Sequence, residues 1–239
     1  MAAAHYVYGN WDQALALAEQ SREGEQESGN LIAAWTHLLP TALIHAARGH
    51  DAAARHHIQQ VTPPEPSGDV QNRVMWCGSM AGIELSMGRQ VEAMRLGRMA
   101  LEMPVTDVGH PGVKVGEASF VDAAIAMGDR DAMGWLRQLI ERRPAGHRPP
   151  FTRALLAKLR AVLDEDASAF SEAGAVLRAI PAPGPLARTL EQHAAAMIAE
   201  GRRNDAAALL AEAHEISAAL GVQPAPAPAA PAATAQRVT

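Results

Sequence analysis

The most regular hydrophobic pattern in the chain lies near its C-terminus. Between residues 209 and 220 apolar side chains recur every three or four positions, and a similar stripe runs from 186 to 197. The two stripes consist of Leu209, Ala213, Ile216 and Leu220, and of Leu186, Leu190, Ala194 and Met197. This spacing is that of one face of a helix, and each stripe needs a partner to leave water. The pattern therefore predicts a helical hairpin.

A short turn pattern precedes several of these stripes. Residues 8–15 read Y-G-N-W-D-Q-A-L, in which Gly9 can take the left-handed conformation that ends a helix, and Asn10 with Gln13 resembles a capping box. Comparable turns contain Gly49, Gly88, Gly128 and Gly201, usually with an alanine shortly afterwards. The first four glycines are about 40 residues apart, a period typical of stacked helical hairpins.

Between these turns the apolar positions predict a series of helices. The expected ranges are 11–24, 30–48, 51–61, 69–87, 89–103, 112–127, 130–142, 151–163, a helix that ends near 179, and a last hairpin over 186–220. Gly221 fits the position after a helix end, and Pro224 cannot continue one. We therefore expect one repeat domain over residues 1–222, with a truncated first repeat, and a disordered Pro/Ala-rich tail over 223–239.

The composition agrees with an all-α protein. Hydrophobic residues make up 48% of the chain but aromatic residues only 4%, and alternating β-branched runs typical of strands are missing. A net charge of -5 argues against a general nucleic-acid surface. The single cysteine, Cys77, excludes an internal disulfide, and the sequence has neither a signal peptide nor a membrane-length apolar run. These features favour a cytoplasmic protein.

The turn residues resemble those of the tetratricopeptide (TPR) family. Gly9-Asn10-Trp11 with Ala14 matches that family's turn, and its small residues in first helices correspond to Ala42, Ala81 and Ala194. The resemblance implies a TPR-like right-handed superhelical solenoid of about five to six helical hairpins. The long, alanine-rich form, with its ending E-A-H-E-I-S-A-A-L-G-V, is similar to the MalT-like helical-repeat region of bacterial signalling ATPases and transcriptional regulators.

This resemblance implies a non-catalytic module for protein interaction or ligand sensing. Its partner would be a protein segment or a small-molecule inducer on the concave face, without cofactor, metal, membrane or direct nucleic-acid contact. The chain has no G-x-x-x-x-G-K-[ST] phosphate loop, so ATP hydrolysis is not assigned to it. A free-standing assembly scaffold is an alternative.

Two glycines inside a predicted helix mark the candidate binding surface. Gly78 and Gly82 lie four residues apart, and each costs about 1 kcal/mol relative to alanine in a helix. Close packing of two helices is the simpler interpretation. The repeat alignment also allows an apolar groove for a partner, lined by Leu39, Leu43, Met75, Gly78, Gly82, Leu85, Val115 and Ile125.

Other reactive residue types form weaker patterns. A group of histidines could support a metal-dependent enzyme, but H-E-x-x-H is absent; the group is His37, His45, His50, His56 and His57. Asp164 to Asp166 is expected to form a turn and helix cap, and Cys77 to pack in the core. The basic residues around 142–153 are expected in a solvated loop.

Overall fold

The computed structural model describes residues 5–6, 8–28, 34–61, 68–104 and 109–222, in which eleven α-helices and one short 3-10 helix occur and no strand is found. The proposed tail at 223–239 lies outside the described residues. The α-helices are α2 (Trp11–Ser28), α3 (Ala34–Ala47), α4 (Asp51–Gln59), α5 (Val70–Ser86), α6 (Gln90–Glu102), α7 (Pro111–Met127), α8 (Arg130–Glu141), α9 (Pro150–Leu163), α10 (Ser168–Ala179), α11 (Pro183–Ala199) and α12 (Arg203–Ala219), with η2 (Ala145–His147) between α8 and α9. The all-helical prediction is confirmed.

The predicted turn glycines set the helix ends. All of them have positive φ angles, which are 76° at Gly9, 76° at Gly49, 75° at Gly88, 66° at Gly128 and 83° at Gly201. Gly221, with φ of 72°, ends α12 in the same way. Since a side chain would strain this conformation, glycine stops each helix where the sequence predicts.

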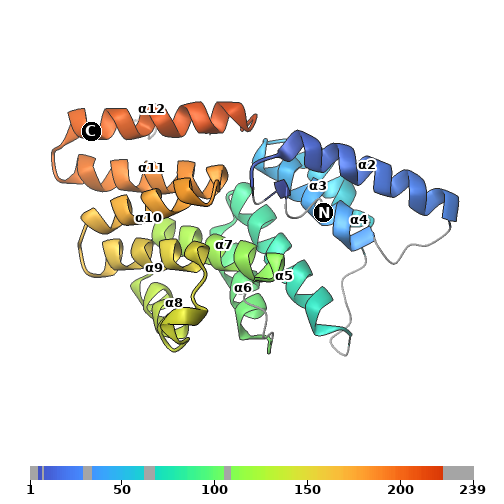
Figure 1. Cartoon of the computed structure of the whole chain (residues 1–239), viewed down its shortest axis with the longest axis horizontal. Coiled ribbons are helices and arrows are strands. Elements are labelled where there is room, and N and C mark those ends of the chain that lie inside the picture. The colour runs from blue at the N-terminus through green and yellow to red at the C-terminus, as the bar shows by residue number, and fades with distance from the viewer. Residues whose placement is uncertain (1–4, 7, 29–33, 62–67, 105–108, 223–239) are drawn as a thin grey trace, which may run out of the picture.

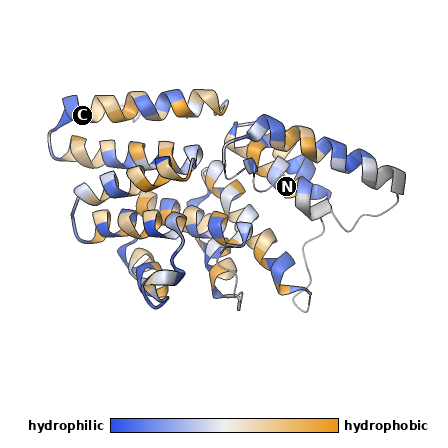
Figure 2. Ribbon diagram, in the orientation of Figure 1, coloured by the Kyte–Doolittle hydropathy of each residue, from blue (hydrophilic) through white to orange (hydrophobic). Residues whose placement is uncertain are grey.

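Neighbouring helices pack through apolar faces, and most of the largest core cluster lies in the second half of the chain, with Val74 and Leu101 added from α5 and α6. It joins α7, α8 and α9 through residues such as Phe120, Leu136 and Leu155, and extends to Ala213 of α12. A smaller cluster joins α3, α4, α5 and α6 around Leu43. Figure 2 shows polar and apolar residues interspersed along the helices, and no helix in the described part of the chain is long and apolar enough to cross a membrane.

The two ends of the helical series meet. In Figure 1 the end of α12 lies beside α2 and α3. Trp11 of α2, Ile44 of α3 and Leu220 after α12 form one buried apolar cluster. Arg48, in the turn after α3, donates from Nε to the Leu220 carbonyl oxygen at 2.9 Å and from Nη2 to Asp12 Oδ1 at 2.7 Å. We call this contact the end joint.

Candidate functional site

The eight residues predicted to line an apolar groove divide into two groups by burial. Leu39 and Leu43 are 0% and 3% exposed, and Gly78 and Gly82 are also buried. The remaining four, Met75, Leu85, Val115 and Ile125, are half-buried. The structure brings Leu43, Gly82 and Val115 together, since a Cβ at Gly82 would lie 2.6 Å from Leu43 Cδ2 and 3.0 Å from Val115 Cγ1.

The other members of the predicted groove lie in separate clusters. Leu39 belongs to a small apolar cluster, and Met75 packs against that cluster. Ile125 packs against the largest core cluster. The predicted residues are therefore distributed over more than one core cluster. Partner binding at individual half-buried members stays a prediction.

Gly78 brings the backbones of α5 and α7 into contact. A Cβ at Gly78 would lie 1.9 Å from the Gly112 carbonyl oxygen, and one at Gly112 would lie 2.5 Å from the Val74 carbonyl oxygen. One turn further along the same face of α7, a Cβ at Gly97 of α6 would lie 3.0 Å from the Gly116 carbonyl oxygen. We call these four glycines, 78, 97, 112 and 116, the glycine seam. Close helix packing is thus the role of Gly78 in this structure.

A second set of contacts on α7 surrounds the Asp122 carboxylate and consists of charged residues and one amide. Asp122 of α7 forms a buried ion pair with Lys158 of α9, and its Oδ1 also accepts a hydrogen bond from Gln192 Nε2 of α11 at 3.1 Å. Arg188 Nε of α11 lies 3.6 Å from Asp122 Oδ2. We call these four residues the charged seam. Lys158 is only 1% exposed, so its ammonium depends on Asp122 for compensation.

Five residues earlier on α7, Glu117 has a similar environment. Its carboxylate is fully buried and accepts hydrogen bonds from Arg143 Nη1 at 2.6 Å and from Thr152 Oγ1 at 3.0 Å. Burial raises the pKa of the Glu117 carboxyl above its ordinary value, although Arg143 and Thr152 act in the opposite direction. Since Glu117 and Asp122 are both engaged by cations, they hold α7 to α9 and α11 rather than present a free acid or base.

Glu117, Asp122 and Lys158 were not predicted as site residues from the sequence. A sequence pattern could have indicated the two carboxylates. In residues 113–124, V-K-V-G-E-A-S-F-V-D-A-A, two acidic residues that are five positions apart interrupt an apolar stretch. Buried charges are rarely unpaired, so such residues predict partners elsewhere in the chain.

Four of the five grouped histidines contact one another on α3 and α4. His45 Nδ1 lies 3.4 Å from His50 Nδ1, and the rings of His45 and His57 are stacked with centroids 5.5 Å apart. His56 meets His57 edge to face and bonds to Gln60. Burial, followed by the neighbouring histidines, lowers the pKa values of His45 and His57. Among the described residues no group of three or more His, Cys, Asp or Glu side chains could hold a metal ion.

The remaining candidate residues are buried or bonded within the fold. The Cys77 thiol is buried, and burial raises its pKa, which keeps it protonated at neutral pH. Asp164 pairs with Arg137 at 2.7 Å, and Asp166 Oδ1 accepts from the Ser168 amide at the start of α10. The acidic residues thus lie in the expected turn, while the N-cap position of α10 is occupied by Ala167. Arg148, in the basic loop, donates to backbone carbonyls of residues 141 and 143.

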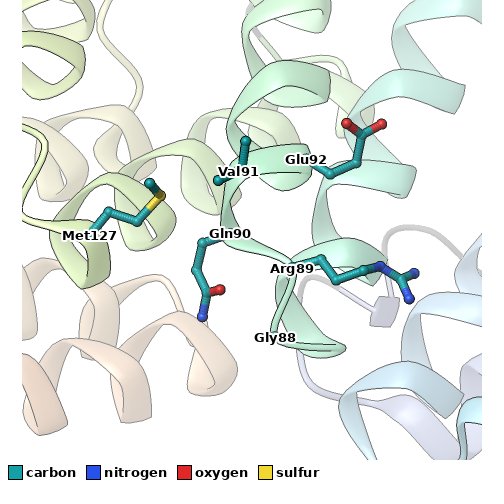
Figure 3. Close-up of a pocket in the computed structure, with 6 residues that line it drawn as sticks. All are labelled: Gly88, Arg89, Gln90, Val91, Glu92 and Met127. Atoms are coloured by element: carbon teal, nitrogen blue, oxygen red, sulfur yellow. The ribbon is translucent and has the colours of Figure 1, made fainter.

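A surface recess lies beside the Gly88 turn. Its volume is about 380 Å³, and it is lined by residues 88–92 and by Met127 at the end of α7 (Figure 3). Val91 and Met127 are 69% and 47% exposed, although both are large apolar residues. Arg89, at the rim, is held by an ion pair with Glu84. A second recess, of about 270 Å³, lies at the equivalent Gly201 turn but is lined by polar residues 201–205.

A comparison of the two recesses shows which feature distinguishes the one at Gly88. Both lie at a turn glycine, so a hollow at such a turn is not by itself specific to the Gly88 site. Only the recess at Gly88 combines this hollow with an exposed valine and methionine from two helices. Comparison with known proteins adds no further assignment: no family model, no curated protein and no solved structure matches the chain.

Proposed function

We propose that the protein is a non-catalytic interaction module, a TPR-like right-handed superhelical solenoid of about five to six hairpins, that binds a segment of another protein. The recurrence of left-handed glycine turns about every 40 residues supports the repeat architecture. The pairing of the buried carboxylates Glu117 and Asp122 with cations supports a structural rather than a catalytic role for these groups.

The observation that carries the binding proposal is the exposure of Val91 and Met127 at one recess. Exposed apolar side chains that come from two helices and border the same hollow are typical of interaction sites. The recess lies on the surface and its accessible lining is mainly apolar, although Arg89, Gln90 and Glu92 also border it. An open apolar hollow of this kind suits an apolar side chain of a peptide better than an enclosed small molecule.

The wider setting of the module follows from the sequence resemblance alone. We place it in the cytoplasm as part of a bacterial signalling or transcription-regulatory protein of the MalT-like type. A free-standing scaffold would use the same recess, and a small-molecule inducer is the alternative ligand for a sensor.

A peptide selection tests the binding site even though the natural partner is unidentified. A random peptide library is selected on the purified protein, and the affinities of selected peptides are measured by fluorescence polarisation. We expect Val91→Asp and Met127→Lys to weaken binding at least about tenfold, the loss of one apolar anchor. Val91 lies in the first turn of α6 and Met127 in the last turn of α7, where these charges suit the helix dipoles.

The matched control is Leu210→Lys on α12. Leu210 is 42% exposed, close to the 47% of Met127, but lies away from the recess. We expect this variant to bind the selected peptides like the unmodified protein. Equal binding by Val91→Asp, or equal loss in Leu210→Lys, would show that the recess is not the binding surface.

A further inference from the structure

Two histidine nitrogens face each other across the Gly49 turn. His45 lies in the last turn of α3 and His50 is the residue before α4. Their Nδ1 atoms are 3.4 Å apart and their ring centroids 5.7 Å apart, so the two nitrogens lie between the rings and point toward one another.

This arrangement has room for one proton between the two nitrogens. A neutral imidazole carries one N–H and one acceptor nitrogen, so one ring can donate to the other. When both rings are protonated, both Nδ1 atoms are donors and both rings are positive. Two N–H groups would then face each other without an acceptor, so the two Nδ1 atoms must move apart.

The surroundings add positive charge to this pair. His57 of α4 stacks on His45, its Nδ1 is buried without a hydrogen-bond partner, and Arg48 lies between the two histidines in the turn. Negative charge is present on Asp12 and Glu19 of α2, but Asp12 bonds to Arg48 and Glu19 to Arg22. The other titratable or charged groups around this hairpin are His37 on α3, Asp51, Arg55 and His56 on α4, Glu84 on α5, and Arg89 in the following turn.

Arg48 connects this turn to the other end of the protein. Its guanidinium reaches the Leu220 carbonyl, packs 3.1 Å from the position that a Cβ on Gly221 would take, and lies over the Trp11 ring at 5.8 Å. The two histidines flank Arg48 in a six-residue segment, so a change in the backbone of this turn would move the residue that holds α12.

We propose that His45 and His50 form a pH-sensitive latch: protonation of both rings separates them, displaces Arg48, and releases α12 from α2 and α3. The lowered pKa values of His45 and His57 agree with this direction, because they mean that the folded arrangement disfavours the charged rings. The latch would couple acidification to separation of the first and last helices.

A distance measurement between the two ends tests the latch. Spin labels are attached to cysteines at Ala16→Cys on α2 and Ala208→Cys on α12, both exposed positions, in a Cys77→Ala background. The distance between the two spin labels is recorded at pH 7.5 and pH 5.5. We expect one distance at pH 7.5 and a shift of population to longer distances at pH 5.5. Arg48→Gln, which removes the joint's charged contacts, should show the longer distances at both pH values.

The histidine variants separate the latch from general acid effects. His45→Gln/His50→Gln keeps polar side chains that cannot gain charge, so we expect the pH 7.5 distance at both pH values. His214→Gln, at an exposed position on α12, should respond to pH like the unmodified labelled protein. An unchanged distance in that protein at pH 5.5, or the same opening in His45→Gln/His50→Gln, would overturn the proposal.

Discussion

Helix α7 is held on its two sides by opposite means. Toward α5 and α6 it uses the glycine seam, in which missing side chains let backbones touch. Toward α9 and α11 it uses two buried carboxylates: Asp122 pairs with Lys158 of α9, and Glu117 pairs with Arg143 in the loop after α8 and accepts a hydrogen bond from Thr152 of α9. Both arrangements are buried, but they respond differently to substitution. The glycine seam depends on the volume at each position, whereas the charged seam depends on partners being present together.

The largest effect should come from removing one member of the charged seam. Lys158→Met leaves the buried Asp122 carboxylate without its ammonium, and we expect a loss of about 3–5 kcal/mol in the free energy of unfolding, measured by urea denaturation. Asp122→Asn/Lys158→Met removes both charges and keeps an amide for Gln192. This double variant should recover most of the loss; an additive further loss would contradict the pairing.

The glycine seam should show a smaller but sizeable steric effect. Gly78→Ala places a Cβ against the Gly112 backbone, which cannot rotate away, so α5 and α7 must separate. We expect a destabilisation of about 3 kcal/mol, at the upper end of overpacking costs. Gly134→Ala is the control, because this glycine lies within α8 with no neighbour within 4 Å of a Cβ. It should stabilise by up to about 1 kcal/mol through helix propensity.

A substitution at Gly82 tests whether the loss of stability depends on what the added Cβ meets, a flexible side chain or a backbone. A Cβ there meets the tip of the Leu43 side chain, which can change rotamer, and alanine gains helix propensity. We expect Gly82→Ala to change the unfolding free energy by less than about 1 kcal/mol, as measured in the same urea series. A loss as large as that of Gly78→Ala would mean that Leu43 cannot move.

Titration should separate the histidine hairpin from the charged contacts of α7. The folded-state pKa values of His45, His57 and His193 are lowered by burial, so the unfolded chain binds more protons and stability falls as the pH drops through about 6.5. Glu117 has the opposite sign, since its pKa is raised and its contribution is lost as the pH rises.

The check is thermal melting between pH 7.5 and pH 5.5. We expect a lower midpoint at pH 5.5, and a smaller decrease in His45→Gln/His57→Gln, in which His193 remains. Because Glu117 acts in the other direction, it cannot produce this decrease. An equal decrease in the double variant would assign the pH dependence to other groups.

Local features of the fold could be predicted from sequence because they depend on neighbouring residues. The turn glycines require a left-handed conformation wherever they end a helix, and the helices lie within a few residues of the expected ranges. Helix α2 continues to Ser28, beyond the expected end at 24, through a Glu/Gln-rich stretch that favours helix.

Long-range contacts could not be predicted in the same way. Gly78 and Gly82 indicated a close approach, but their spacing could not show that Gly112 was the partner. Asp122 and Lys158 are 36 residues apart in sequence, and no local pattern connects them. The recess at Val91 and Met127 depends on how the ends of two helices meet. In the sequence, each residue is typical of an ordinary amphipathic helix, so the recess could not be predicted.

The end joint changes how cooperative the protein should be. In an array whose repeats touch only their neighbours, stability is roughly a sum of local terms, and the end units can fray independently. Arg48 and Leu220 are 172 residues apart in sequence, and fraying of α12 would expose Trp11 and Ile44 at the opposite end. The two ends should therefore protect each other's amides from hydrogen exchange, and folding should be slower than in an array of local contacts because this contact closes a long loop.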